Sequence, residues 1–206
     1  MGGSILGTEA IYQFLSKKIK KNFDFINNLK PQINFENNAI NIIVSKSGET
    51  LETISNLKVL LKKNKNIKKN IFITENRDSY LKKIAEKMKD DVIEHKNYIG
   101  GRFSVLSEVG MLPAELMGMN INKFKRFNQL IKNKNFKKNL ILNVDQTLKL
   151  VSSGKSNSII LNYDENSENL FKWYQQLIAE SLGKKSKGII PIISSMPKDN
   201  HSLLQL

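Results

Sequence analysis

Six consecutive residues in the first quarter of the chain carry groups suited to binding an anion: Ser45, Lys46, Ser47, Gly48, Glu49 and Thr50. An apolar, β-branched run at 42–44 precedes them, and a helical pattern at 51–61 follows. The unpaired N–H groups at a helix N-terminus carry partial positive charge, and the hydroxyls and the lysine add donors and charge. The stretch therefore predicts a phosphate-bearing ligand at the carboxyl edge of a parallel sheet. An ordinary helix-capping loop is the alternative interpretation.

Two glycine-rich stretches could bring further groups close to such a ligand. Gly2, Gly3 and Ser4 precede a helical pattern and can form a second cradle of backbone N–H groups. The pair Gly100–Gly101 precedes Arg102, one of three arginines in the chain. An arginine most often makes a surface ion pair, but the glycines would let backbone and guanidinium approach a ligand closely.

Three side chains towards the end of the chain are candidates for acid–base chemistry. Gln176 and Glu180 are four residues apart, so they share one face of a predicted helix. Glu180 lies near the C-terminal end of that helix, where the helix dipole disfavours a negative charge, and it is a candidate proton acceptor. His201, one of two histidines, suits proton transfer near neutral pH. A solvated surface glutamate and a structural histidine are the alternatives.

Composition restricts the class of protein. The chain has 206 residues, of which 40% are hydrophobic, enough for one sizeable core. No apolar run approaches the roughly 18 residues that span a bilayer, and the N-terminus lacks the charged-then-apolar order of a signal peptide. Cysteine is absent, which excludes disulfides and thiolate chemistry. We therefore expect a cytoplasmic protein with no membrane partner.

The net charge of +14 suggests a nucleic acid or another polyanion as partner. Only three of the 33 basic residues are arginines, however, and the lysines are spread through nearly every helix-like segment. The basic clusters at 17–21 and 62–65 have no interleaved aromatic residues on which bases could stack. We therefore expect no nucleic-acid partner. The alternative, a basic nucleic-acid binder, predicts affinity that falls steeply with salt.

The elements that must position these residues alternate between strand and helix. Hydrophobic patterning predicts strands at 23–26, 40–44, 71–74, 92–93, 158–161 and 188–193. Helices are expected at 10–19, 50–63, 79–88, 106–117, from 121 onwards, at 138–152 and at 168–182. This alternation is typical of an α/β fold built on a doubly wound parallel sheet.

Five motifs together resemble the glucose-6-phosphate isomerase (phosphoglucose isomerase) family, in the family's order and along the whole chain: Gly2–Gly7, Val44–Thr53, Ile99–Ser104, Gln175–Lys184 and Asp199–Leu206. The resemblance implies sugar-isomerase (SIS) domains, each a parallel sheet between helices, with the active site between two of them. We expect 1–122 to form the first sugar-phosphate-binding domain. The remainder, 123–206, is expected to form connecting helices and the start of a second domain.

The resemblance also implies a role for each candidate residue. Sugar-phosphate contacts are implied for Gly3, Ser4, Ser45, Lys46, Ser47, Gly48, Thr50, Gly101 and Gln176. Ser47 stands where many members have threonine, which keeps the hydroxyl. Glu180 resembles the general base, Arg102 the residue that stabilises the cis-enediolate, and His201 the ring-opening residue that reaches into a neighbouring subunit's site.

This chemistry explains the residue types. Aldose–ketose isomerisation moves a proton between adjacent carbons on one face of a planar enediol, so one carboxylate can serve both steps. A fixed cation stabilises the developing oxyanion, and the remote phosphate positions the reacting carbons. No metal or organic cofactor is expected.

The resemblance therefore implies an isomerase that interconverts glucose 6-phosphate and fructose 6-phosphate, with a hexose phosphate as ligand and a homodimer at full length. Family members have a segment before the first glycine loop and a long one after the position of His201, which carries a further catalytic lysine. We accordingly expect this chain to be a fragment that is inactive, or nearly so, alone. The alternative is a non-catalytic SIS module that binds a sugar phosphate, which would keep the 45–50 stretch but would not need Arg102, Glu180 and His201 together.

Overall fold

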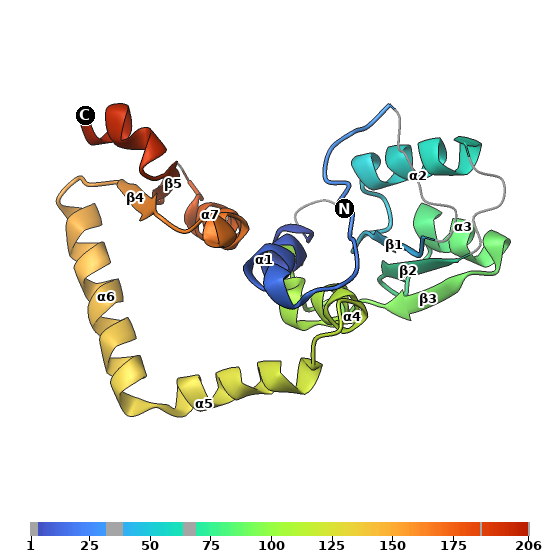
Figure 1. Cartoon of the computed structure of the whole chain (residues 1–206), viewed down its shortest axis with the longest axis horizontal. Helices are drawn as coiled ribbons and strands as arrows, with labels where there is room; N and C mark the ends of the chain where they lie inside the picture. The colour runs from blue at the N-terminus through green and yellow to red at the C-terminus, as the bar shows by residue number, and fades with distance from the viewer. Residues whose placement is uncertain (1–3, 32–38, 64–68, 186, 206) are drawn as a thin grey trace. The chain divides into compact units, whose positions relative to one another are not determined.

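A computed structural model describes residues 4–31, 39–63, 69–185 and 187–205 (Figure 1). The chain divides into two compact units. The first consists of Met1–Glu9 and Lys20–Pro113, and the second of Ala10–Ile19 and Ala114–Leu206. Helix α1 (Leu6–Phe14) contributes to both units, and the short 3-10 turn η1 (Ser16–Lys18) follows it.

The first unit is built on a three-stranded parallel sheet in the order β1-β2-β3. Its strands are β1 (Asn41–Val44), β2 (Asn70–Thr74) and β3 (Asp91–Glu94). Its helices are α2 (Leu51–Lys63), α3 (Tyr80–Met88), the 3-10 turn η2 (Gly101–Leu106) and α4 (Glu108–Leu116). Val44 pairs with Ile73, and Ile73 with Ile93, so the carboxyl ends of all three strands meet at one edge.

Apolar side chains fill both faces of this sheet, which explains why its strands read as nearly continuous apolar runs. On one face, Ile43 and Phe72 pack with Leu57 of α2 and Leu81 of α3. On the other, Val44, Ile73 and Val109 of α4 form a second cluster. Successive strand residues point to opposite faces, so the two clusters sit above and below the same strands. Figure 1 shows the resulting layers, with α2 and α3 on one side of the sheet and α4 on the other.

The second unit contains a two-stranded parallel sheet with a long crossover helix. The strands are β4 (Asn157–Asn162) and β5 (Ile190–Ser195), joined through η4 (Glu165–Ser167) and α7 (Glu168–Leu182). The Gln175 Nε2 donates to the Pro191 carbonyl at 2.7 Å and ties α7 to β5. The remaining elements are η3 (Ile121–Arg126), α5 (Phe127–Lys132), α6 (Lys134–Ser152), η5 (Lys198–His201) and η6 (Leu203–Gln205).

The predicted α/β fold with parallel sheets is confirmed, and so are most of its elements. Ser79 caps α3, and α7 spans the predicted 168–182. The predicted helix at 10–19 instead begins at Leu6 and ends at Phe14.

The strand predicted at 23–26 is wrong, because these residues form no strand. Phe23 and Phe25 stack their rings at 6.4 Å, and the segment that follows is held by side chains. The Asn56 Nδ2 donates to the Asn28 carbonyl at 2.9 Å, and the Lys30 N–H donates back to the Asn56 Oδ1 at 3.1 Å. The backbone is thus fixed by an asparagine of α2 rather than by a neighbouring strand.

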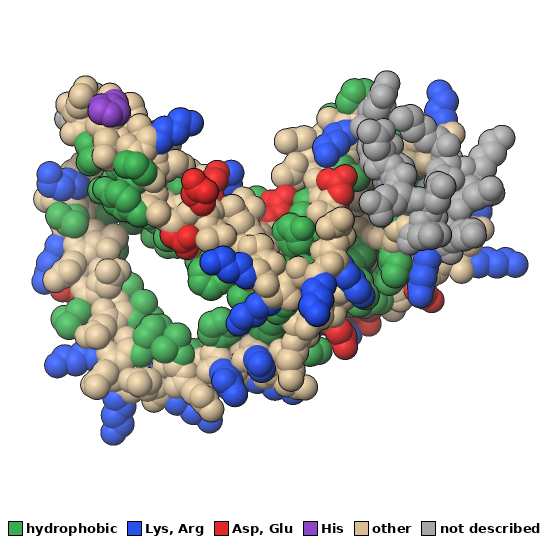
Figure 2. Space-filling model, viewed as in Figure 1, with side chains coloured by type: hydrophobic (Ala, Val, Ile, Leu, Met, Phe, Trp, Pro, Cys, Tyr) green, Lys and Arg blue, Asp and Glu red, His purple; other side chains and the backbone are tan. Residues whose placement is uncertain are grey.

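Lysine and arginine side chains do not gather into a single patch on the face shown in Figure 2, where they stand apart over many elements. Some pair within their own helix, as Lys149 does with Asp145 and Lys172 with Glu168, each at 2.7 Å. Such exposed pairs and solvated lysines add little to stability. The absence of a nucleic-acid partner stays a prediction. In the described part of the chain, no helix is both long and apolar enough to cross a membrane.

Candidate functional site

The 45–50 stretch forms a tight turn between β1 and α2, and its shape depends on glycine. Gly48 has a φ of +69°, a conformation that residues with a Cβ rarely adopt. A Cβ at this position would lie 2.2 Å from the Ser79 Oγ, so the turn also needs the missing side chain for space. The Leu81 N–H donates to the Gly48 carbonyl at 3.1 Å, which joins the turn to the start of α3.

The Ser45 hydroxyl organises this turn from within. Its oxygen accepts from the N–H of Gly48 at 3.0 Å and of Thr50 at 3.4 Å, and lies 2.8 Å from the Thr50 hydroxyl. The Ser47 hydroxyl accepts from the Glu49 N–H at 3.1 Å, so its own proton can be donated to a ligand. The two serine hydroxyls therefore satisfy N–H groups of the turn just before α2, and the Ser47 hydroxyl remains able to donate to a ligand.

A cavity of about 350 Å³ opens beside this turn and brings several of the predicted residues together. Its lining consists of Ser4, Val44, Ser45, Lys46, Ser47, Thr50, Glu75 and Arg77. Ser4 comes from the start of the chain and approaches Gly101, where an added Cβ would lie 2.9 Å from the Ser4 Oγ. Gly101 thus leaves room for Ser4 beside the turn. Gly3, the other candidate of that loop, lies outside the described residues.

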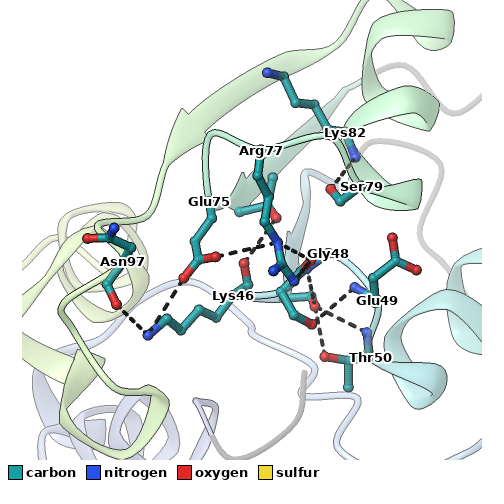
Figure 3. Close-up of polar contacts among 12 residues, drawn as sticks. Lys46, Gly48, Glu49, Thr50, Glu75, Arg77, Ser79, Lys82 and Asn97 are labelled. Atoms are coloured by element: carbon teal, nitrogen blue, oxygen red, sulfur yellow. Dashed lines mark hydrogen bonds and ion pairs between the residues drawn. The ribbon is translucent and has the colours of Figure 1, made fainter.

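Lys46, Arg77 and Glu75 form a charged group at the cavity wall (Figure 3). The Lys46 Nζ donates to the Asn97 carbonyl at 2.7 Å and lies 3.7 Å from Glu75. The Arg77 Nε lies 3.5 Å from the same carboxylate, whose side chain is only 16% exposed. The Arg77 Nε and Nη2 also donate to the Ser47 carbonyl, at 3.1 and 2.7 Å. Contacts within the protein therefore fix the positions of Lys46 and Arg77.

Arg77 and Glu75 are site residues that the sequence analysis missed. Glu75 follows β2 directly and Arg77 lies two residues further on, just as Ser45 and Lys46 follow β1. Because parallel strands end at the same edge, polar residues after the predicted strand 71–74 could have been expected at the same cavity. Glu49 adds a further link at this edge, since its carboxylate accepts from the Tyr80 N–H at 2.7 Å.

His95 is a third residue that the sequence analysis did not single out. It is 1% exposed, its Nδ1 hydrogen-bonds Glu108, and its Nε2 is buried without a partner among the described residues. The pair joins the end of β3 to the start of α4 and so spans the loop that contains Asn97, Gly101 and Arg102. No local sequence pattern predicts this pairing, because His95 and Glu108 are thirteen residues apart.

The remaining predicted site residues, Arg102, Gln176, Glu180 and His201, do not line the cavity beside the 45–50 turn. Arg102 belongs to the first unit, where its guanidinium lies over the Phe103 ring at 4.5 Å. Gln176, Glu180 and His201 belong to the second unit, on α7 and η5. Glu180 and His201 are exposed, while Gln176 is half-buried.

One feature of the second unit is compatible with a ligand near Gln176. Its Oε1 is buried and has no hydrogen-bond partner in the described ranges, although its neighbour Gln175 is bonded to Pro191. A buried polar atom without a partner is unfavourable unless a ligand or water supplies one. No group of three or more His, Asp or Glu side chains that could hold a metal occurs in the part of the chain that the structure describes.

Comparison with known proteins gives one consistent match. The family model described as phosphoglucose isomerase matches residues 1–192. The glucose-6-phosphate isomerase of Methanocaldococcus jannaschii is 38% identical, over all of this chain and 55% of that protein. The glucose-6-phosphate isomerase of Acholeplasma laidlawii is 32% identical, over all of this chain and 54% of that protein.

A solved structure shares the fold. The crystal structure of a hypothetical protein, TT0462, from Thermus thermophilus superposes with a TM-score of 0.82 at 26% sequence identity. The match covers all of this chain and 54% of that one. The chain thus spans about half the length of the curated relatives it matches.

Proposed function

The chain belongs to the phosphoglucose isomerase family, and we propose that it supplies the sugar-phosphate clamp and the proton-transfer carboxylate of an isomerase that interconverts glucose 6-phosphate and fructose 6-phosphate. The observation that carries the proposal is the cavity beside Ser45–Thr50, which gathers hydroxyls, a lysine and a helix N-terminus at the carboxyl edge of a parallel sheet. These are the groups that bind a phosphate.

The phosphate end of the substrate lies in this cavity in our proposal. Ser47 and Thr50 donate hydroxyl hydrogen bonds, Lys46 supplies charge, and Ser4 closes the cavity from the first loop. Gly3, Gly48 and Gly101 allow the backbone to approach. This binding energy is remote from the reacting carbons, so it serves to hold them in the reactive geometry.

The reacting end of the substrate is served by residues outside that cavity. Glu180 removes the proton from one carbon and returns it to the next, and Arg102 stabilises the negative charge of the cis-enediolate. Gln176 contacts the sugar, and its buried Oε1, which has no hydrogen-bond partner among the described residues, supports that assignment. His201 opens the sugar ring in a neighbouring subunit, so the proposal includes a homodimer. No cofactor is required for these steps.

The domain division is part of the same proposal. Residues 1–122 would form the first SIS-type domain with a doubly wound sheet, and 123–206 the connecting helices and the beginning of a second. The parallel sheets β1-β2-β3 and β4-β5 support this division. The relatives' greater length supports the expectation that the 206-residue chain has little or no activity alone.

The clamp is tested by comparing the binding of fructose 6-phosphate and fructose to the purified chain by calorimetry. We expect the phosphate ester to bind and the free sugar to give no measurable heat. Ser47→Ala should weaken binding of the ester about tenfold, which corresponds to the lower end of the energy range for a hydrogen bond to a charged group. Ser152→Ala is the matched control, because that hydroxyl donates within α6 to the Leu148 carbonyl. Equal affinity for ester and sugar would contradict the clamp.

The proton transfer is tested on the protein as its cell makes it. Glucose 6-phosphate is incubated in D₂O, and deuterium at the second carbon is followed by NMR. Glu180→Gln should slow the exchange by about 10²–10⁴-fold, the contribution of a general base. Glu168→Gln, on the same helix and paired with Lys172, should leave it unchanged. Tight binding of the ester without any exchange would favour the non-catalytic sugar-phosphate module instead.

A further inference from the structure

The cavity beside Ser45–Thr50, here called the clamp cavity, is lined by a second cation in addition to Lys46. Arg77 follows β2 and lines the same cavity as Lys46, although the two are 31 residues apart in sequence. Both cations face the carboxylate of Glu75, at 3.7 Å from Lys46 and 3.5 Å from Arg77. The parallel pairing of β1 with β2 brings the two strand ends together and makes this arrangement possible.

The guanidinium of Arg77 is held so that part of it remains available. Its Nε and Nη2 donate to the Ser47 carbonyl. A guanidinium has five N–H donors in a fixed plane, so two bonds to one carbonyl leave others for a ligand. The side chain is half exposed, at 50%, and therefore accessible from solvent. Ser47 itself is a residue whose hydroxyl can donate to the same ligand.

We propose that Arg77 is a second phosphate-binding cation, which together with Lys46 outweighs the Glu75 carboxylate and favours a doubly charged phosphoryl group as ligand. The inference rests on the proposed function and extends it, because it concerns how the clamp selects its ligand. A phosphate monoester near neutral pH carries close to two negative charges. Beside the Glu75 carboxylate, Lys46 alone would leave the cavity with no net positive charge, and Arg77 restores one. The Glu75 carboxylate positions both cations beside the cavity.

A purely structural role for Arg77 makes a different prediction. If the guanidinium only fixes the Ser47 carbonyl, its loss distorts the turn and weakens every tetrahedral anion alike. If it pairs with the ligand, its loss weakens a dianion more than a monoanion of the same shape. Phosphate and sulfate esters provide that comparison, since a sulfate ester is tetrahedral but carries one negative charge.

The experiment measures the affinity of the full chain for glucose 6-phosphate and for glucose 6-sulfate by calorimetry at pH 7.5. We expect the chain to prefer the phosphate ester by about tenfold, as an additional charge-assisted hydrogen bond implies. Arg77→Gln should weaken the phosphate ester about tenfold and the sulfate ester about twofold, so that the preference shrinks. Arg77→Lys keeps the charge and should retain most of the preference. Arg126→Gln removes the same charge from the exposed turn η3 and should change neither affinity.

Equal weakening of both esters by Arg77→Gln, or no weakening of either, overturns the inference but leaves the proposed isomerase function standing. A phosphate preference that depends on Arg77 in a protein that exchanges no deuterium into glucose 6-phosphate supports the inference and removes the proposed function. If the chain binds neither ester, both are wrong.

Discussion

Replacing Gly48 by alanine tests directly whether the clamp turn has the shape described. The residue has a φ of +69°, and an added Cβ would meet the Ser79 Oγ at 2.2 Å and the Ser79 Cβ at 2.6 Å. Two separate penalties therefore apply at this position. One is the left-handed backbone, and the other is the contact with the residue that caps α3.

The magnitude follows from adding these terms. A left-handed alanine is disfavoured by about 1–2 kcal/mol, and overpacking in a filled site adds roughly 1–3 kcal/mol. Alanine also lowers the conformational entropy of the unfolded chain, which offsets about 0.4–1 kcal/mol of this destabilisation. We therefore expect Gly48→Ala to lower the free energy of unfolding by roughly 1–4.6 kcal/mol.

The free energy of unfolding is measured by urea titration followed by circular dichroism. Gly154→Ala is the matched control, because its φ is +89° and an added Cβ would meet nothing within 4 Å. It should lose at most about 1.5 kcal/mol, the backbone term alone. The double variant Gly48→Ala/Ser79→Gly removes both close contacts, and glycine weakens a helix cap by only a few tenths of a kcal/mol. It should therefore recover most of the difference between the two single variants.

Two results would refute this reasoning. If Gly48→Ala is no more destabilising than Gly154→Ala, the turn does not pack against α3 as described. If Ser79→Gly recovers nothing, the strain arises from a neighbour other than Ser79. In a variant that folds, binding of fructose 6-phosphate should also weaken, because the Gly48 and Thr50 N–H groups that surround the Ser45 hydroxyl would shift.

Three further predictions concern other parts of the chain. Phe72→Ala should lower the free energy of unfolding by about 3–5 kcal/mol in urea titration, because the ring is fully buried in the sheet core; a loss below about 1 kcal/mol would contradict that packing. Glu108→Ala should lose about 1–3 kcal/mol by leaving the buried His95 Nδ1 unpaired, whereas Glu108→Gln should lose clearly less, and equal losses would contradict the pairing. The Ser167 hydroxyl donates to Asp164 and holds the pKa of that carboxyl below its ordinary value. This hydrogen bond therefore stabilises the fold at pH values above the ordinary pKa, and the stabilisation disappears as pH falls through the lowered pKa. Ser167→Ala should bring the pKa of Asp164 back towards the ordinary value in an NMR titration, and an unchanged pKa would show that another contact is responsible.

Local patterns in the sequence were enough to place most helices and strands. The run Ile42–Val44 forms β1, and the repeat that begins at Leu51 forms α2, because side-chain periodicity is a local property of the backbone. The segment 23–26 shows where this fails. Its alternating phenylalanines fit a strand, but a strand also needs a partner edge, and here Asn56 of α2 satisfies the neighbouring backbone instead.

The sequence by itself predicted an anion-binding turn at 45–50 and indicated the family of the chain, because each of the five motifs consists of residues that are adjacent in sequence. Ser45, Lys46 and Gly48 favour an anion-binding turn here because they stand between a predicted strand and a predicted helix. Only the tertiary structure placed Arg77 at the same cavity and joined His95 to Glu108. Parallel pairing of strands brings residues together that are far apart in sequence, and no local periodicity records which strand ends will meet.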